Sequence, residues 1–204
     1  MYNLILQDFH LLDREVINVY PFGSRVYGTV SNDSDYDFVV IADKQIREYS
    51  LSAPNHKLNI HLYSPEMFEE QLVNHKIVSL ECLFAPKHLL LKNTKNFPFK
   101  LNKEILRKSI SEKASHSWVK AKKKIEVEKD RNFYIAKKSL FHALRIIDFG
   151  IQIAANSKII DYTSSNYIWD AIKNNSHEDW ATYKNKYQEI FNSKMTEFRK
   201  LAPK

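Results

Sequence analysis

Apolar residues in the first hundred positions recur at spacings that predict alternating helices and strands. Between residues 4 and 12 they follow one face of a helix, so we expect an amphipathic helix to open the chain. Short β-rich runs over 16–22, 37–42 and 58–63 are typical of strands, and the middle run is apolar enough for a strand covered on both faces. This order of elements predicts an α/β sheet domain.

A helix is expected to follow the third strand. Ser64 is a suitable N-cap and Pro65 fits the first helical position. Glu66 and Glu69 then place acidic side chains near the positive end of the helix dipole. The alternation of strands and helices therefore continues beyond residue 64.

Strand signals fade after about residue 100, and helical spacing replaces them. Helices are predicted from 105 through the basic run 120–124, and over 134–155, 165–173 and 177–201. The second half of the chain should therefore be a helical bundle. Since no internal repeat or low-complexity linker separates the halves, we expect two domains, 1–100 and 101–204, that pack together.

Composition places the chain among ordinary globular proteins. Of its 204 residues, 44% are hydrophobic and 27% are charged, which argues against a disordered chain. No apolar run approaches the roughly 20 residues that a membrane helix needs, and the first residues lack the features of a secretory signal. Cys82 is the single cysteine, which excludes an intrachain disulfide or a cysteine metal site. A cytoplasmic location and no membrane partner are the resulting expectations.

Charge is distributed unevenly along the chain. Residues 1–100 carry 10 Lys and Arg against 12 Asp and Glu, a balance of −2, whereas residues 101–204 carry 21 against 12, a balance of +9. Such a basic half can face a polyanion, nucleic acid above all. It can equally be a solvated, lysine-rich helical surface, and the sequence leaves both interpretations open.

Two of the three glycines lie close together, at positions 23 and 28. Gly23 and Ser24 directly follow the first predicted strand and begin a short helix. Glycine is used where the backbone takes a positive φ or approaches a ligand closely, and backbone N–H groups at such a point can bind phosphate. Taken alone, the same two residues are also compatible with a plain turn.

A pair of acids precedes the second predicted strand. Asp35 and Asp37 are two positions apart, so on a strand their side chains point to the same face. Neighbouring carboxylates repel each other unless a cation lies between them, and hard oxygen ligands are what Mg²⁺ prefers. The competing interpretation is an Asp-rich turn.

The two features together, at this spacing, resemble a known family. A Gly-Ser pair at 23–24, ten intervening residues and Asp-x-Asp at 35–37 resemble the nucleotidyltransferase superfamily that includes DNA polymerase β. The segments 63–68 and 80–86, and the stretch 138–145, look most like the small predicted nucleotidyltransferase branch of that superfamily. The resemblance implies a small mixed sheet with flanking helices, followed by a helical bundle.

The resemblance also implies roles for particular residues. Asp35 and Asp37 would hold two Mg²⁺ ions, with Mn²⁺ as the alternative metal. Gly23 and Ser24 would cradle the phosphates of an NTP, with ATP as the expected nucleotide. Arg25 is a further candidate for gripping phosphate, because its planar guanidinium can bind bidentately. Its alternative role is a salt bridge with a nearby acid such as Asp33.

Further candidates lie outside the motif. Lys138, His142 and Arg145 are spaced i, i+4 and i+7 on one predicted helix, so they share a face that could hold the triphosphate or the acceptor backbone. A solvated helix face is the alternative. Glu81 lies among apolar residues, where a buried acid needs a partner, and we expect it to orient Arg25 or a lysine unless it faces solvent.

Asn59 departs from the family pattern. The superfamily normally has a third aspartate at this position, and an amide can ligate only weakly and cannot act as a base. Three interpretations remain open. In the first, the site works with two carboxylates and help from His61. In the second, it binds nucleotide without turnover, and in the third, the chain carries an engineered substitution of that aspartate.

Three functions follow as hypotheses. The first is metal-dependent transfer of NMP from an NTP to the 3′ hydroxyl of a nucleic acid, with RNA favoured, and it fits the basic second half. The second is transfer of AMP to a protein side chain, as in small antitoxin nucleotidyltransferases. The third is a nucleotide- or RNA-binding module that has lost turnover, which the departure at Asn59 would explain.

Overall fold

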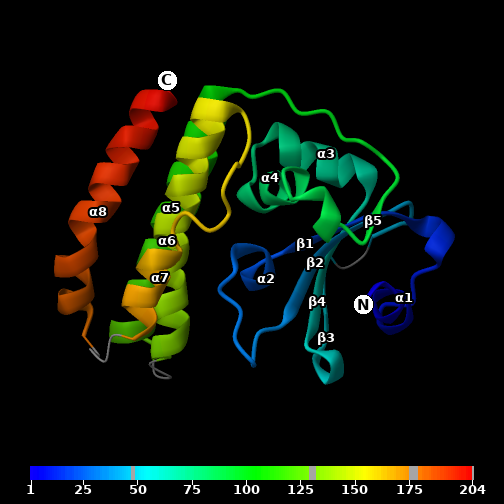
Figure 1. Cartoon of the computed structure of the whole chain (residues 1–204), viewed down its shortest axis with the longest axis horizontal. Coiled ribbons are helices and arrows are strands. Elements are labelled where there is room, and N and C mark those ends of the chain that lie inside the picture. Colours follow the sequence, from blue (N-terminus) through cyan, green and yellow to red (C-terminus); the bar gives the residue numbers. More distant parts are fainter. Residues whose placement is uncertain (47–48, 129–131, 175–178, 204) are drawn as a thin grey trace. The chain divides into compact units, whose positions relative to one another are not determined.

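The computed structural model describes residues 1–46, 49–128, 132–174 and 179–203 (Figure 1). The chain forms two compact units, Met1–Lys100 and Leu101–Lys204. The first is a mixed α/β unit and the second is helical, as the sequence predicted. None of the helices formed by the described residues has the length and apolar character that crossing a membrane requires.

A mixed sheet is the centre of the first unit. Its strands are β1 (Val16–Phe22), β2 (Tyr36–Ala42), β3 (Ser50–Ala53), β4 (Leu58–Tyr63) and β5 (Lys92–Asn93). Within the described residues the order across the sheet is β3-β4-β2-β1-β5. Only the neighbours β2 and β4 run parallel; the pairs β1–β2, β1–β5 and β3–β4 are antiparallel. The three strands predicted from the sequence are therefore confirmed.

Helices cover both faces of this sheet (Figure 1). They are α1 (Tyr2–Asp8), α2 (Ser24–Tyr27), α3 (Pro65–Val73) and α4 (Ile77–Leu83), with short 3₁₀ turns at Asp13–Glu15, Pro54–His56 and Lys87–Leu89. Ile5 of α1 joins a buried cluster with Val40 and Ile60 on one face. On the other face Phe68 of α3 stacks on Tyr20, with ring centroids 5.8 Å apart. As predicted, the Ser64 hydroxyl caps α3 by accepting from the Met67 backbone N–H.

Burial along the strands follows from these layers. From Phe38 to Ala42 every residue of β2 is buried, because helices lie on both sides of this central strand. In β4, Leu58 and Ile60 point into the cluster with α1, whereas Asn59 and His61 are half-buried on the opposite face. The period of two in this strand therefore places polar side chains together on one face of the sheet.

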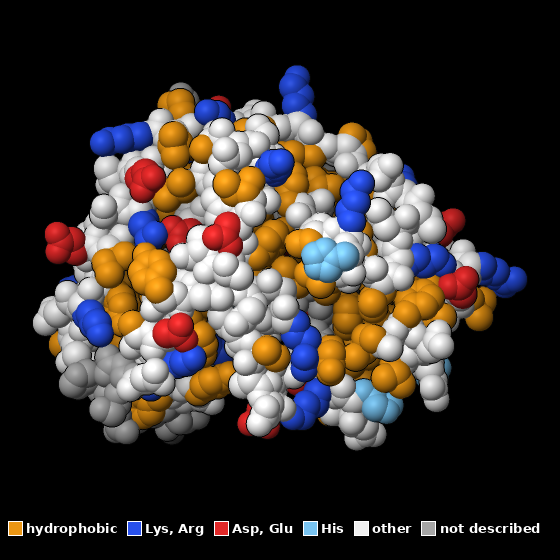
Figure 2. All heavy atoms as spheres, viewed as in Figure 1, with side chains coloured by type: hydrophobic (Ala, Val, Ile, Leu, Met, Phe, Trp, Pro, Cys, Tyr) orange, Lys and Arg blue, Asp and Glu red, His pale blue; other side chains and the backbone are white. Residues whose placement is uncertain are grey.

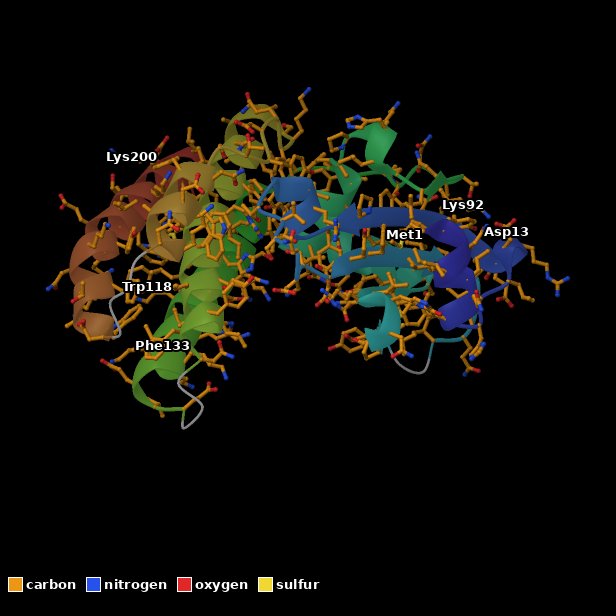
Figure 3. The ribbon with its side chains drawn as sticks, turned by 60° about the horizontal axis from the view of Figure 1, so that its bottom comes forward. Met1, Asp13, Lys92, Trp118, Phe133 and Lys200 are labelled. Atoms are coloured by element: carbon orange, nitrogen blue, oxygen red, sulfur yellow. The ribbon has the colours of Figure 1, made fainter. Side chains whose placement is uncertain are left out.

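The N-terminal segment is tied to the edge strand β5 (Figure 3). Asp13 accepts a hydrogen bond from the Tyr2 hydroxyl at 2.6 Å, and the Lys92 ammonium lies 3.0 Å from the same carboxylate. These hydrogen bonds, from Tyr2 first and Lys92 second, lower the pKa of Asp13. The opening helix ends at Asp8, so the prediction that it extends to Leu12 is wrong: His10 has a φ of 50°, which an α-helix cannot accommodate.

The second unit is built around one central helix. Its helices are α5 (Lys103–Glu126), α6 (Phe133–Asn156), α7 (Asn166–Lys173) and α8 (Trp180–Leu201). Leu140 and Leu144 of α6 pack against Ala121 of α5, Ile172 of α7 and Tyr183 of α8 in one core cluster. The four predicted helices are confirmed, although the predicted start of the last one at 177 lies outside the described residues.

The surface carries both signs of charge. On the face shown in Figure 2, Lys and Arg side chains are interspersed with Asp and Glu, and apolar side chains lie between them. Several ion pairs join neighbours on one helix, among them Lys122 with Glu126 at 3.6 Å and Lys173 with Asp170 at 2.6 Å. Such exposed pairs contribute little to stability, typically about 0–1 kcal/mol each.

Candidate functional site

Four strands of the sheet bring a row of side chains together on one face. Phe22 of β1 pairs with Asp37 of β2, Asp37 pairs with Asn59 of β4, and Asn59 pairs with Ser52 of β3. Directly paired residues on neighbouring strands project to the same face. The row therefore places one predicted acid, the exceptional asparagine and a serine side by side across the sheet.

A chain of hydrogen bonds runs along this row. The Ser52 hydroxyl donates to Asn59 Oδ1 at 2.7 Å, and Asn59 Nδ2 donates to Asp37 Oδ1 at 3.3 Å. Asn59 thus offers Asp37 an N–H donor where an aspartate would offer a second negative charge. A hydroxyl can both donate and accept, so Ser52 would also satisfy the amide if it turned its oxygen toward Asp37.

The turn after β1 lies against the same acid. Gly23 has a φ of 81° and a ψ of −159°, a conformation that is essentially restricted to glycine. A Cβ atom at Gly23 would lie 2.6 Å from Asp37 Oδ2, far inside van der Waals contact. The turn continues into α2, which begins at Ser24 and is followed by its C-cap Gly28, another residue with positive φ. Gly23, Ser24 and Asp37 are thus brought together at one end of β1.

Asp35 lies just before β2, one residue outside the strand, and its side chain is exposed. The expectation that both acids belong to a strand edge therefore applies to Asp37, whereas Asp35 belongs to the preceding loop. Arg25 fixes this loop: its Nε donates to the Asp35 carbonyl at 3.3 Å and its Nη2 to the Ser34 carbonyl at 3.1 Å.

Arg25 also stacks on an aromatic ring. Its guanidinium carbon lies 3.6 Å from the centroid of the Tyr36 ring, a close cation–π contact. Asp33, the alternative partner predicted for Arg25, lies 3.5 Å from the Lys57 ammonium instead. Arg25 therefore holds the loop that carries Asp35, and its side chain remains exposed beside that loop.

The donor set fits a metal site that the substrate completes. Among the residues that the structure describes, no group of three or more His, Cys, Asp or Glu side chains could hold a metal ion by itself. Mg²⁺, however, is commonly bound through one or two carboxylates together with substrate phosphates and water. Asp37 beside the glycine turn, with Asp35 two residues earlier in the adjoining loop, would supply the carboxylates of such an arrangement. Asn59 would add a neutral oxygen if its amide rotated.

A buried acid supports this turn through a residue that was not predicted from the sequence. Glu81 of α4 is 3% exposed and accepts a hydrogen bond from the hydroxyl of Tyr27, the last residue of α2. The alternative that Glu81 faces solvent is therefore wrong. Tyr27 was not predicted as a site residue, although the sequence shows that it lies between Gly23 and Gly28. The contact anchors α2, and with it Ser24, to α4.

His61 lies two residues beyond Asn59 on the same face. Its ring centroid is 5.3 Å from that of Phe22, 6.4 Å from that of Tyr49 and 6.3 Å from that of Tyr63. The last two contacts are edge-on, a favourable geometry for aromatic pairs. His61 is thus part of an aromatic group at the edge of the row.

Three further predicted residues belong to α6 in the second unit. The Lys138 ammonium lies 5.4 Å from the centroid of the Tyr134 ring. Arg145 is only 4% exposed, and its guanidinium lies 5.5 Å from the rings of both Phe141 and Phe149, so for Arg145 the alternative of a solvated helix face is wrong.

Basic groups also surround His142. Burial is the main cause that lowers its pKa well below the ordinary value, and the charges of Arg145, Lys138, Lys120 and Lys113 act in the same direction. The part that Lys138, His142 and Arg145 take in binding nucleotide stays a prediction.

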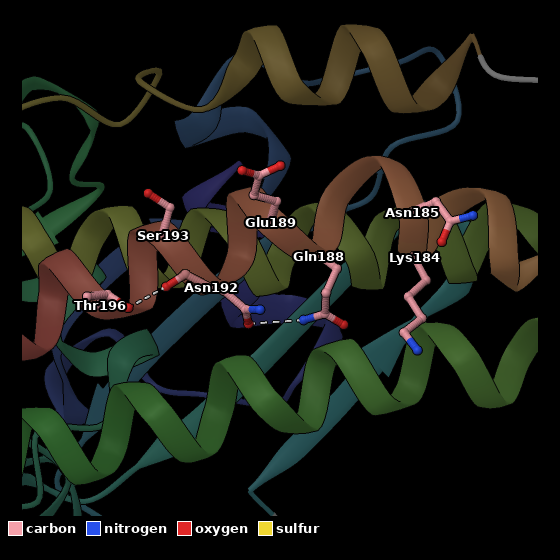
Figure 4. A pocket seen from close by; sticks show the side chains of 7 residues that line it. All are labelled: Lys184, Asn185, Gln188, Glu189, Asn192, Ser193 and Thr196. Atoms are coloured by element: carbon pink, nitrogen blue, oxygen red, sulfur yellow. Dashed lines mark hydrogen bonds between the residues drawn. The ribbon is translucent and has the colours of Figure 1, made fainter.

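A shallow pocket lies on α8 of the second unit (Figure 4). It is lined by polar side chains of that one helix: Lys184, Asn185, Gln188, Glu189, Asn192, Ser193 and Thr196. Some of them bond within the helix, as Gln188 Nε2 does to Asn192 Oδ1 at 3.1 Å and Thr196 Oγ1 does to the Asn192 carbonyl at 2.8 Å. The pocket includes none of the predicted site residues and offers no paired acids.

Comparison with known sequences gives one family match. The sequence model of the family described as "Nucleotidyltransferase domain" matches residues 4–185. The matched range includes the Gly-Ser turn, both acids and most of the helical unit. No curated protein matches the chain.

Two solved structures are similar over almost the whole chain. Spectinomycin adenyltransferase AAD(9) from Enterococcus faecialis, solved with ATP and spectinomycin, is 12% identical with a TM-score of 0.48, and the match covers 98% of this chain and 99% of that one. A nucleotidyltransferase-like protein from Exiguobacterium sibiricum is 11% identical with a TM-score of 0.33, and the match covers 98% of this chain and 72% of that one.

Proposed function

Because the chain belongs to the nucleotidyltransferase domain family, we propose that it moves NMP from a metal-bound NTP to the 3′ hydroxyl of a nucleic acid. The chain is a nucleotidyltransferase enzyme, and its substrate is a nucleotide. ATP is the expected nucleotide, Mg²⁺ the expected metal and RNA the expected acceptor. The observation that carries this proposal is the contact of the Asp37 carboxylate with the Gly23 turn.

That contact supports a division of labour at the site. The backbone of the Gly23 turn and the Ser24 hydroxyl would bind the terminal phosphates, and no Cβ intrudes between them and Asp37. Asp35 and Asp37 would hold the metal; when bound, Mg²⁺ would neutralise the triphosphate and lower the pKa of the attacking hydroxyl. The acceptor hydroxyl gives up its proton to water as its oxygen forms a bond to the α-phosphorus, and the bond from that phosphorus to the leaving diphosphate breaks.

The remaining residues hold this arrangement in place. Arg25 keeps the Asp35 loop in position through two backbone carbonyls, and the Glu81–Tyr27 contact anchors α2. Such preorganisation allows charged groups to stabilise a transition state without rearranging during the reaction. Lys138, His142 and Arg145 are proposed to contribute to nucleotide binding, and residues 101–204 to form a basic helical domain.

Asn59 makes this a site with two carboxylates, and restoring the aspartate tests that view. We expect Asn59→Asp to raise Mg²⁺-dependent transfer by roughly 10²-fold, because it adds a charged ligand where only an amide stands. Without metal the variant should melt at a lower temperature than the wild type, since two carboxylates would then face each other across β2 and β4. Transfer rates and melting curves in Mg²⁺ and in EDTA would measure both effects.

The matched control for this change is Asn59→Ala, which removes the amide without adding charge. A rate for Asn59→Asp no higher than that of the wild type would contradict the view that the missing ligand limits the reaction. It would mean instead that this site is adapted to asparagine, and that the idea of an engineered substitution fails.

The nucleic-acid acceptor is tested by labelled transfer at several salt concentrations. With α-labelled ATP and Mg²⁺, we expect label on RNA oligonucleotides with a free 3′ hydroxyl, and RNA binding that weakens steeply between about 50 and 200 mM salt. The balance of +9 in residues 101–204 is the reason, since each neutralised phosphate releases counterions.

The same reaction run in a cell lysate distinguishes the acceptors. Label that appears on protein and not on RNA would replace the nucleic-acid acceptor with a protein side chain. RNA binding that does not respond to salt would also contradict the acceptor proposed here. Label on neither acceptor, with ATP still bound, would leave a nucleotide-binding module without turnover.

A further inference from the structure

The β4 and β3 side of the row carries aromatic rings next to the reacting centre. Tyr49, directly before β3, is 57% exposed, and its ring centroid lies 6.4 Å from that of His61. His61 in turn contacts Phe22 at 5.3 Å across β2, next to Asp37. His61 therefore connects the row at Phe22 with the exposed ring of Tyr49.

The side from which the acceptor attacks determines which part of the substrate lies near these rings. If the phosphates are bound at Gly23, the leaving diphosphate lies toward β1. In phosphoryl transfer the attacking and leaving oxygens are roughly in line through the phosphorus. The acceptor must then approach from the opposite side of Asp37, over Asn59 of β4 and Ser52 of β3.

The side chains on that side can meet a sugar hydroxyl and a planar base. Ser52 and Asn59 can bond a sugar hydroxyl. Two residues along β4 from Asn59, about 7 Å away, His61 contacts the exposed ring of Tyr49, on which a planar group can stack.

We infer that the exposed ring of Tyr49, which His61 contacts edge-on, is a stacking platform for the terminal base of the acceptor strand. The inference rests on the proposed function and adds to it the part of the acceptor that is recognised. The terminal sugar lies over Ser52 and Asn59 with its 3′ hydroxyl toward the α-phosphorus, and the base lies on the face of the Tyr49 ring. Stacking uses the face that every base has, so the platform does not select among bases.

The test uses an RNA oligonucleotide with fluorescent 2-aminopurine as its 3′-terminal base. Titrated with the full chain, Mg²⁺ and a non-hydrolysable ATP analogue, the fluorophore should be quenched because it stacks. We expect Tyr49→Ala to weaken the binding of this oligonucleotide about tenfold and to reduce the quenching, whereas Tyr49→Phe and Tyr49→Trp keep both. Binding of the ATP analogue should stay within about twofold in all three variants, since Tyr49 is not proposed to touch it.

Two controls make the outcome decisive. Tyr167→Ala removes another exposed tyrosine, 63% exposed and in the second unit, and should change neither binding nor quenching. An oligonucleotide whose last residue is abasic should bind the wild type and Tyr49→Ala equally weakly.

Equal binding of the normal oligonucleotide to wild type and Tyr49→Ala, or no quenching in the wild type, would overturn the platform. Failure to bind the ATP analogue would instead reject the proposed function, and the platform would then be judged by quenching without nucleotide.

Discussion

Replacing Asp37 with Asn should reduce metal-dependent NMP transfer by at least about 10³-fold, with little change in folding. The carboxylate lies against the Gly23 turn and is the one acid of the motif that the sheet itself holds. An asparagine there still accepts the hydrogen bond that Asn59 Nδ2 donates, so the row across the sheet persists. What is lost is the negative charge that holds the metal and the triphosphate together.

Steady-state transfer of label from α-labelled ATP measures this loss, and thermal unfolding checks the fold. Asp33→Asn is a matched control, because it makes the same change four residues earlier at a carboxylate that is 98% exposed. That variant should retain nearly full activity. If Asp37→Asn stayed within tenfold of the wild type, Asp37 would not be the metal ligand, and the proposed chemistry would need another centre.

Replacing Gly23 with Ala should abolish activity almost as completely, for a steric reason. The added Cβ would lie 2.6 Å from Asp37 Oδ2, and a backbone with φ of 81° and ψ of −159° is strained for any residue with a side chain. Either Asp37 or the turn must move, which separates the phosphate cradle from the acid. We expect a loss of transfer on the order of 10²-fold or more, since small displacements in an active site have effects of that size.

The same change should lower the free energy of unfolding by about 1–3 kcal/mol, the typical cost of such a backbone conformation. Urea unfolding gives this value, and transfer assays give the rate. Gly28→Ala is the control, because Gly28 also has a positive φ, 73°, but ends α2 and is exposed. It should lose about 1 kcal/mol of stability and keep most of its activity. Full activity in Gly23→Ala would show that this turn does not approach the phosphates.

The sequence predicted those elements whose pattern is set by burial. The runs 16–22 and 58–63 became β1 and β4 with the same limits, because a strand covered on one or both faces needs a regular apolar pattern. β3 was missed, since Ser-Leu-Ser-Ala carries little β preference and the strand is stabilised by pairing with β4. The end of α1 was misjudged because Phe9 and Leu12 fit a helical period although His10 ends the helix.

The sequence predicted which residues belong to the candidate site but not which of them are in contact. Glycine and aspartate at fixed spacing indicated which residues to consider, and the family match covers them. The contact between Gly23 and Asp37, however, depends on the register of β1 against β2, which sequence spacing does not determine. The link from Ser52 to Asn59 depends on the pairing of β3 with β4, and the link from Tyr27 to Glu81 joins α2 to α4 across 54 positions of the chain.

A crystal structure with Mn²⁺ and a non-hydrolysable ATP analogue tests the central claim most directly, because anomalous scattering locates the metal independently of its surroundings. The account predicts a Mn²⁺ peak at about 2.1 Å from a carboxylate oxygen of Asp37, the distance typical of such ions. It also predicts terminal phosphates on the backbone of Gly23 and Ser24. Metal and triphosphate bound elsewhere on the chain, with Asp37 bonded only to Asn59, would contradict it.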